Sequence, residues 1–331
     1  MSASKTVAVP NEKLPNHGLG QLGRWCGHHL PESYVHRSTG LPFHVKSLYL
    51  TPLFLLLLIA TAVAQPITGR ITDSRTHAAL PYANIGVLGK DLGTVADEQG
   101  AYTLAFQKSL ATATVRISSL GYAPRNLTLA ELAAQPNVAL APEAVPLAEV
   151  LVHGKAGFRR THTLGNTGNA EMATNTLASN SLGGQVGTVI KLSRRPTRIV
   201  NAVFNIARSS PGQVTFRVNV YRLDPDGKPT ETKLLPRDVI VTSPIVRGPI
   251  TVDLSADRLV LNEDFFLAIE LLKWDDPAPH DAEFAFSAAL GYFHNEIYYR
   301  RTSQAPWKRA SIGALMAGMQ PRLSFFVTVN D

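Results

Sequence analysis

The stretch from residue 66 to residue 122 most constrains the fold, because turn signals separate its short strand-like segments at regular intervals. Four segments rich in β-branched and aromatic residues alternate with Gly, Pro, Asn and Asp: residues 68–72, 82–88, 102–106 and 112–118. Gly93 and Gly100 supply the backbone freedom that tight turns need. This pattern predicts a small β-sandwich, with further strands expected at 126–129 and 137–140.

Four motifs follow one another in this stretch: Gly-x-Ile-x-Asp at 69–73, Leu-Pro-Tyr-Ala-Asn at 80–84, Asp-x-x-Gly-x-Tyr at 97–102 and Gly-Tyr at 121–122. Their order resembles the carboxypeptidase regulatory-like domain, a transthyretin-like β-sandwich of bacterial envelope proteins. One departure is Ala96, where this family usually has Thr. The resemblance implies a domain over residues 65–142 that, in metallocarboxypeptidases, accompanies the catalytic unit without doing its chemistry.

An export signal precedes this module. Lys46 leads into an apolar stretch from Leu48 to Ala60, which is followed by the small-x-small site Ala62-Val63-Ala64. The apolar run is shorter than the ~20 residues of a membrane-spanning helix. We therefore predict a cleaved signal peptide over residues 45–64. The mature protein is expected to be periplasmic, outer-membrane-associated or secreted, with no membrane span.

A signal peptide is expected at the start of a chain, yet 44 residues precede this one. They contain the single cysteine, Cys26, and no obvious repeat or strand pattern. We interpret residues 1–44 as a mis-called upstream extension or a disordered segment, because Val45 read as an initiating Met would give a normal signal peptide. The mature chain then has no cysteine, so neither disulfides nor thiol chemistry is expected.

Residues 143–186 are predicted to be a connecting strand and a polar linker or long loop, because they are rich in Gly, Asn, Thr, Ser and Ala. Residues 146–154 resemble the segment that follows this domain in TonB-dependent receptors; the alternative is a last strand of the sandwich. The residues beyond lack the repeated alternating strands of ~10 residues that a receptor's transmembrane barrel needs. This excludes a receptor.

Strand patterns return over residues 187–331. Residues 216–223 alternate between apolar and polar side chains, as a half-buried strand does. Eight or nine such segments at short spacing, without sustained helical periodicity, predict a second, larger, jelly-roll-like β-sandwich. The chain is thus expected to be all-β. The pattern of this half is similar to that of uncharacterised domains that follow such modules in Bacteroidetes-type envelope proteins.

His280 and Glu283 are the weak candidates for a metal site. Their H-x-x-E spacing matches the zinc ligands of metallocarboxypeptidases, but zinc needs a third ligand and a catalytic site needs an open position. Only 48 residues follow Glu283, too few for the catalytic domain of such a peptidase. The favoured alternative is a solvated loop, so no metal and no cofactor are predicted.

Other catalytic or ion-binding motifs are absent or incomplete. The segment Asp224-Pro225-Asp226-Gly227 begins like a calcium loop, but Leu235 occupies the twelfth position, so a hairpin turn is predicted. The sequence has no nucleophile elbow, phosphate loop or dinucleotide fingerprint. Hence no catalytic residue is predicted.

Aromatic residues cluster near the C-terminus, where seven of the 25 aromatic residues fall within residues 284–307. Exposed Tyr and Trp rings stack on sugars and form hydrogen bonds at wet interfaces. Tyr292, Tyr299 and Trp307 are therefore candidates for a ligand-binding surface. Because about half of the side chains in strands face the core, packing is the alternative.

Charge and motifs together favour a binding function. The chain has 32 Lys and Arg against 25 Asp and Glu, an excess too small and diffuse to predict nucleic-acid binding. An accessory module, an export signal and the lack of a catalytic motif favour a non-catalytic envelope protein that binds a glycan, a peptide or a partner protein. Two alternatives remain: a hydrolase with an unrecognised site in residues 187–331, and a structural assembly component.

Overall fold

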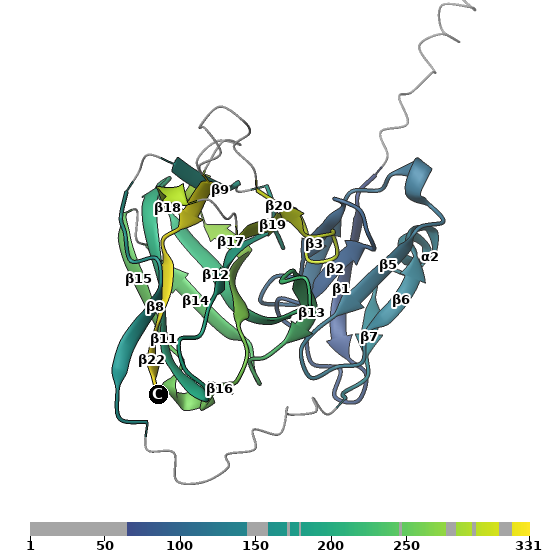
Figure 1. The fold of residues 1–331 in the computed structure, drawn as a ribbon. Coiled ribbons are helices and arrows are strands. Elements are labelled where there is room, and N and C mark those ends of the chain that lie inside the picture. The colour runs from purple at the N-terminus through teal and green to yellow at the C-terminus, as the bar shows by residue number, and fades with distance from the viewer. Residues whose placement is uncertain are drawn as a thin grey trace, which may run out of the picture. The chain divides into compact units, whose positions relative to one another are not determined.

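The computed structural model describes residues 65–143, 158–170, 173–178, 180–244, 247–275, 283–292, 296–310 and 320–331. Residues 62–331 form one compact unit. The described part is almost entirely β, which confirms the all-β fold class (Figure 1). It contains no helix that is both long and apolar enough to cross a lipid bilayer. The predictions for residues 1–44, 45–64 and 146–154 lie outside the described residues.

The first module, residues 65–143, is a sandwich of two sheets. Its strands are β1 (Ile67–Asp73), β2 (Asn84–Val87), β3 (Gly93–Val95), β4 (Ala101–Leu104), β5 (Thr114–Ser118), β6 (Arg125–Thr128) and β7 (Val138–Leu140). They form a sheet of order β4-β1-β7 and a sheet of order β3-β2-β5-β6. Ile71, Ile85 and Ile117 are fully buried between them. All pairs are antiparallel except β1 with β7.

One short helix follows the predicted strand at 126–129, which the structure shows as β6. Helix α2 (Leu129–Ala134) begins at a capping box: the Thr128 hydroxyl accepts from the Glu131 backbone N–H, and the Glu131 carboxylate accepts from the Thr128 N–H. Leu129 and Leu132, three residues apart, are buried in the module core. The predicted strand at 126–129 therefore ends at Thr128. Two 3₁₀ turns, η1 (Lys108–Leu110) and η2 (Ser255–Asp257), are the other helical elements described.

The second module, residues 158–331, contains two larger sheets. Its strands are β8 (Thr161–Gly165), β9 (Ala173–Ala178), β10 (Gln185–Ile190), β11 (Thr197–Ser209), β12 (Gln213–Leu223), β13 (Pro229–Lys233), β14 (Val239–Ser243), β15 (Gly248–Asp253), β16 (Val260–Leu261), β17 (Phe265–Asp275), β18 (Glu283–Tyr292), β19 (Ile297–Arg300), β20 (Lys308–Arg309), β21 (Gln320–Leu323) and β22 (Phe325–Asn330). We call the seven-stranded sheet, of order β13-β12-β17-β10-β19-β20 with β14 also on β12, the charged sheet. The eight-stranded sheet has the order β21-β18-β11-β22-β8, with further strands on β11 and β18.

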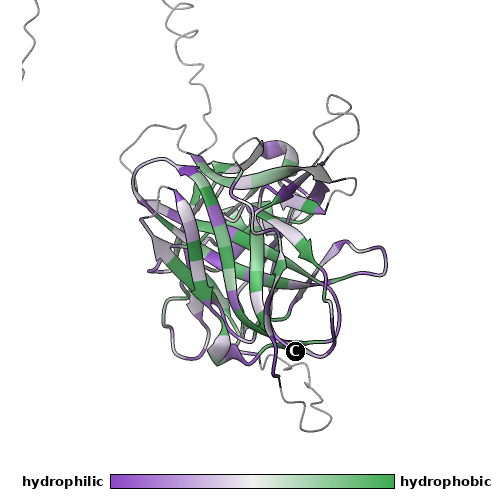
Figure 2. Ribbon diagram, turned by 60° about the vertical axis from the view of Figure 1, so that its left-hand side comes forward, coloured by the Kyte–Doolittle hydropathy of each residue, from purple (hydrophilic) through white to green (hydrophobic). Residues whose placement is uncertain are grey.

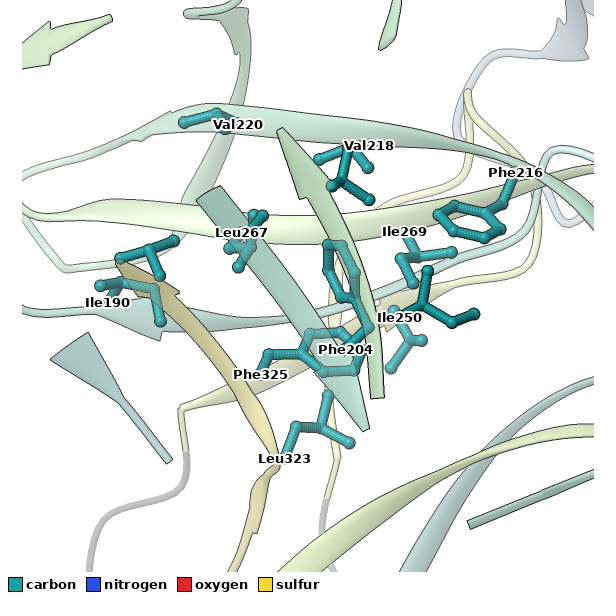
Figure 3. Close-up of a cluster of buried hydrophobic side chains, with 14 of the residues drawn as sticks. Ile190, Phe204, Phe216, Val218, Val220, Ile250, Leu267, Ile269, Leu323 and Phe325 are labelled. Atoms are coloured by element: carbon teal, nitrogen blue, oxygen red, sulfur yellow. The ribbon is translucent and has the colours of Figure 1, made fainter. Parts of the chain in front are cut away.

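The core of the second module lies between these two sheets (Figure 3). Hydrophobic residues run along the strands, as Figure 2 shows. Phe325 is fully buried, with its ring edge-to-face against Phe204 at 4.8 Å and against Phe286 at 5.1 Å. In β12, Phe216 and Val218 point into this core from the other sheet. The alternation predicted for residues 216–223 is thus present, but the strand is not half-buried as expected, because residues 214–221 are buried on both faces.

The predicted polar linker contains two strands that the composition did not reveal. β8 pairs with β22, and β9 pairs with β18. Both add to the eight-stranded sheet, and β8 alternates half-buried and exposed residues over the sequence Thr-His-Thr-Leu-Gly. An outer strand is held mainly by backbone hydrogen bonds and needs few apolar side chains. A polar composition therefore did not exclude pairing here.

The predicted hairpin turn at Asp224 is confirmed. The Gly227 N–H donates to the Asp224 carbonyl at 2.9 Å, and Gly227 has a φ of +76°. The Asp224 carboxylate accepts from the backbone N–H groups of Asp226 and Lys228. This carboxylate therefore caps the turn between β12 and β13.

Candidate functional site

The outer face of the charged sheet carries buried polar residues. The alternation that points Val218 into the core places Arg217 and Asn219 on the opposite face of β12, and Glu270 lies on the same face of β17. Arg217 and Asn219 are each 2% exposed and Glu270 is 0% exposed. Because these strands are buried on both faces, another part of the protein must cover the outer face of the sheet.

Four polar side chains form one row across the strands of this sheet. The register places Arg217 opposite Glu270, Glu270 opposite Gln185, and Gln185 opposite Arg300. Arg217 Nη1 donates to Glu270 Oε2 at 3.0 Å, and Asn219 Nδ2 donates to the same oxygen at 2.9 Å. A buried charge is tolerated only when it is paired and hydrogen-bonded in this way.

Arg217 is the charge at one end of the row. Its Nε lies 3.1 Å from Asp238 Oδ1, and its Nη2 donates to the Tyr82 carbonyl of the first module at 2.7 Å. Burial opposes the charge of Arg217, but the carboxylates of Glu270 and Asp238 outweigh burial and raise its pKa. Burial likewise acts to raise the pKa of Glu270, but the charges of Arg217, Lys233 and Arg300 and the Asn219 hydrogen bond together outweigh it, so the Glu270 pKa is lowered. Both groups are therefore charged.

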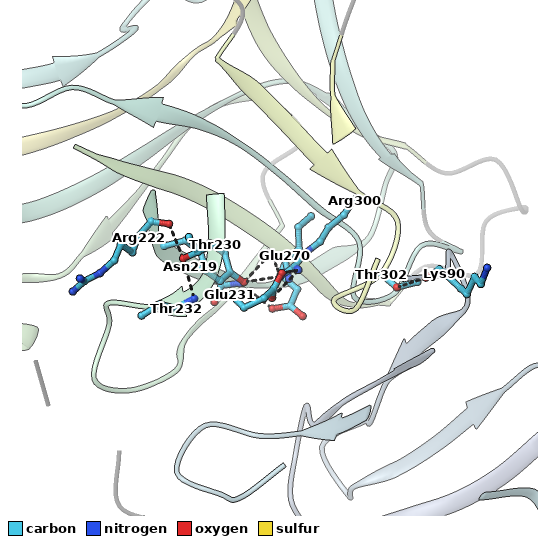
Figure 4. A network of polar contacts seen from close by, with 11 residues as sticks. Lys90, Asn219, Arg222, Thr230, Glu231, Thr232, Glu270, Arg300 and Thr302 are labelled. Atoms are coloured by element: carbon cyan, nitrogen blue, oxygen red, sulfur yellow. Dashed lines mark hydrogen bonds and ion pairs between the residues drawn. The ribbon is translucent and has the colours of Figure 1, made fainter. Parts of the chain in front are cut away.

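Arg300 lies at the other end of the row. Figure 4 shows it together with Glu231 and Glu270. Its Nη1 donates to both carboxylate oxygens of Glu231 at 2.7 and 2.9 Å, and its Nη2 donates to the Tyr221 hydroxyl at 3.1 Å. The guanidinium lies 4.1 Å from the ring centre of Trp307, in cation–π geometry. Burial opposes this charge, but the surrounding groups raise the Arg300 pKa overall. Burial also raises the pKa of Tyr221, so its hydroxyl stays protonated.

The first module supplies the cover. Ile85 and Val87 of β2 face the module's own core, so Asn84 and Gly86 lie on its other face. The Gln304 side chain of the second module packs against Gly86 so closely that an added Cβ would lie 2.8 Å from Gln304 Cγ. An ion pair between Lys308 and Asp91, at 2.8 Å, joins the modules at the rim of this contact.

Gly86→Ala is expected to lower the free energy of unfolding of the chain by about 1–3 kcal/mol, because the new methyl group would overpack against Gln304. The double variant Gly86→Ala with Gln304→Gly removes both side-chain atoms of the clash and is expected to recover most of this loss. Urea denaturation followed by fluorescence measures both. Equal stability of Gly86→Ala and the unmodified chain would contradict the contact.

A pocket of about 350 Å³ remains between the two modules. The first module contributes Asn84, Arg116, Ser118 and Tyr122, and the second contributes Arg217, Glu231, Lys233, Asp238, Arg300 and Ser303, among others. Four polar atoms of the lining residues are buried without a hydrogen-bond partner: Asn84 Oδ1, Ser303 Oγ, Arg217 Nε and Arg300 Nε. Burial and the charge of Arg217 lower the pKa of Lys233. The pocket is thus strongly polar and contains hydrogen-bonding atoms that remain unused.

The residues predicted from the aromatic cluster do not line this pocket together. Tyr298 and Arg300 lie on the Trp307 side of β19, so Tyr299 between them points to the other side. Tyr299 is 37% exposed, whereas Trp307 packs on Tyr221 and Phe266. The structure thus does not bring Tyr299 and Trp307 onto one surface. The side chain of Tyr292 is not among those that the structure describes. Ligand binding by Tyr292, Tyr299 and Trp307 stays a prediction.

The two weak metal candidates are not joined into a site by the described residues. His280 lies outside the described residues. Glu283 forms an ion pair with Arg208 at 2.8 Å on the surface. Within the described ranges, no cluster of three or more His, Cys, Asp or Glu side chains is placed to hold a metal ion.

Sequence reasoning did not identify five site residues: Arg217, Asn219, Lys233, Glu270 and Arg300. A charged residue inside an otherwise apolar strand is the signal that would have found Glu270 and Arg217. Glu270 follows Phe265-Phe266-Leu267-Ala268-Ile269 and precedes Leu271-Leu272. A charge in such a position must find a partner on a neighbouring strand.

These observations define an all-β protein in which a small sandwich covers a charged sheet of a larger one. Residues 67–152 match the family model of the CarboxypepD_reg-like domain, so the first module is of this class, as its motifs predicted. No curated protein matches the sequence.

Solved structures show only distant similarity. One contains the cysteine protease and lectin-like domains of Cwp84, a surface layer associated protein of Clostridium difficile, with 13% identity and a TM-score of 0.34 over 48% of this chain and 36% of that chain. Another, of the infectious bursal disease virus Gx strain, has 11% identity and a TM-score of 0.25 over 75% of this chain and 56% of that chain. The chain therefore spans well under two thirds of either structure, and TM-scores of this size support no functional argument.

Proposed function

We propose that this chain is an exported, non-catalytic binding protein, and that it holds a small polar ligand in the pocket between its two modules. The carrying observation is the pocket itself, at about 350 Å³ within the ~300–1,000 Å³ typical of ligand sites. Its walls come from both modules, so a bound ligand would contact both at once. The signal peptide predicted at residues 45–64 supports placement outside the cytoplasm.

Two kinds of polar atom in the pocket support ligand binding. Arg217 and Arg300 are fixed by their carboxylate partners, so they form a rigid floor that needs no rearrangement on binding. Asn84 Oδ1 and Ser303 Oγ are buried without a partner, so a ligand group that reached them would satisfy two hydrogen-bonding atoms. A preorganised floor with unused hydrogen-bonding atoms is suited to recognition.

A hydrolase is the second candidate, because Glu231, Asp238 and Glu270 converge near the pocket. Hydrolysis of glycosides by paired carboxyl groups needs one group held protonated by a raised pKa. The pKa of Glu270 is instead lowered, and Glu231 and Asp238 are each paired with an arginine. This arrangement favours binding over acid catalysis.

The test is a glycan and peptide array probed with residues 65–331. Ser118→Tyr is expected to raise the Kd of any ligand found at least tenfold. Ser118 lines the pocket, and the added ring would fill it. Thr68→Tyr is the matched control, since it places the same ring on an exposed position of β1 in the other sheet. Unchanged binding by a folded Ser118→Tyr variant would contradict the proposed site, and release of cleaved products would favour the hydrolase.

A further inference from the structure

We propose that the ligand of the pocket is an acidic sugar, a saccharide unit that carries a carboxylate; this rests on the binding function proposed above. The charges and hydroxyl groups of the pocket wall would select such a ligand.

Arg116 carries the argument for the carboxylate. It lies on β5 opposite Gly86, on the face turned toward the second module, and it is half-buried in the pocket wall. No hydrogen bond or ion pair joins its side chain to another residue within the part of the chain described. The other two arginines of the pocket are paired with Glu270, Asp238 and Glu231. A guanidinium that is not already paired binds a carboxylate through two parallel hydrogen bonds.

The balance of charge points the same way. Four cationic side chains meet three carboxylates here: Arg116, Arg217, Lys233 and Arg300 against Glu231, Asp238 and Glu270. The nearest carboxylate paired with Lys233 is that of Asp238, at 3.9 Å. Arg217 is paired with the same carboxylate. One negative charge on the ligand would therefore balance the charges of these seven side chains.

The hydroxyl groups of the wall favour a sugar over other carboxylates. Ser118, Ser119 and Thr232 line the pocket together with the unpartnered Ser303 Oγ and Asn84 Oδ1. Each hydroxyl both donates and accepts, which matches the hydroxyl groups of a sugar ring. Tyr122 adds an aromatic wall, and its orientation is fixed because its hydroxyl donates to Asp73 Oδ2 at 3.1 Å.

The experiment is isothermal titration of residues 65–331 with D-galacturonate and D-glucuronate, and with the neutral sugars D-galactose and D-glucose. We expect at least one uronate to bind at least tenfold more tightly than its neutral counterpart. Arg116→Gln should abolish this preference. Arg70→Gln, at an exposed position of β1, should keep it. N-acetylated dipeptides with a free or an amidated C-terminus form the second arm.

The outcomes separate the two proposals. Equal binding of uronates and neutral sugars, lost in Ser118→Tyr but kept in Arg116→Gln, would overturn the acidic sugar and leave the binding function standing. A preference for the free dipeptide carboxylate over every uronate would likewise overturn the sugar. Binding of none of these probes, together with an empty glycan and peptide array, would overturn both.

Discussion

Glu270→Ala is expected to lower the free energy of unfolding by about 3–5 kcal/mol, because it leaves Arg217 charged and buried beside a missing partner. Asn219 loses its acceptor in the same step. Urea denaturation of residues 65–331 at pH 7 measures the effect. Since the Glu270 pKa is lowered in the folded state, its stabilisation is present above the ordinary carboxyl pKa of ~4.3 and is lost as pH falls through the folded value. The difference between the two proteins should therefore shrink in acid.

A matched pair on the surface provides the control. Arg208 and Glu283 also lie within 2.8 Å, but their side chains are 61% and 45% exposed. Glu283→Ala should therefore cost less than about 1 kcal/mol. A second variant removes both buried charges, Arg217→Met with Glu270→Leu, and should regain most of the stability lost in Glu270→Ala. Equal, small effects of Glu270→Ala and Glu283→Ala would contradict the buried row.

Phe325→Ala is expected to lower the free energy of unfolding by about 3–5 kcal/mol, because its ring fills the centre of the core between Phe204 and Phe286. Its neighbour Phe326 points to the other face of β22 and is only half-buried, so Phe326→Ala should cost clearly less. Both effects are measured by thermal and urea unfolding. A loss at Phe326 as large as that at Phe325 would show that the inward face of β22 has been assigned wrongly.

The sequence predicted the all-β fold because strand periodicity and turn chemistry are local signals. Residues 216–223 alternate as β12 does, and Gly227 marked the hairpin that follows it. Strands β8 and β9 escaped prediction because their pairing partners, β22 and β18, lie more than 100 residues away. Helix α2 was not predicted, although Thr128 and Glu131 have the spacing of a capping box.

The candidate site was hidden for a related reason. Arg217, Gln185 and Arg300 are far apart in the sequence, and only strand register places them in one row with Glu270. The aromatic cluster was visible as composition, but the alternation along β19 separates Tyr299 from Trp307. A site assembled from two modules and several strands leaves no local motif.

Native mass spectrometry of residues 65–331, mixed with a saccharide library that includes uronates, tests most directly whether the pocket binds without turnover. We expect a one-to-one complex from which the ligand is recovered with unchanged mass. This complex should be lost in Ser118→Tyr but not in Thr68→Tyr. Recovery of cleaved products that disappear in Ser118→Tyr would instead make the pocket an active site and contradict a non-catalytic binding function.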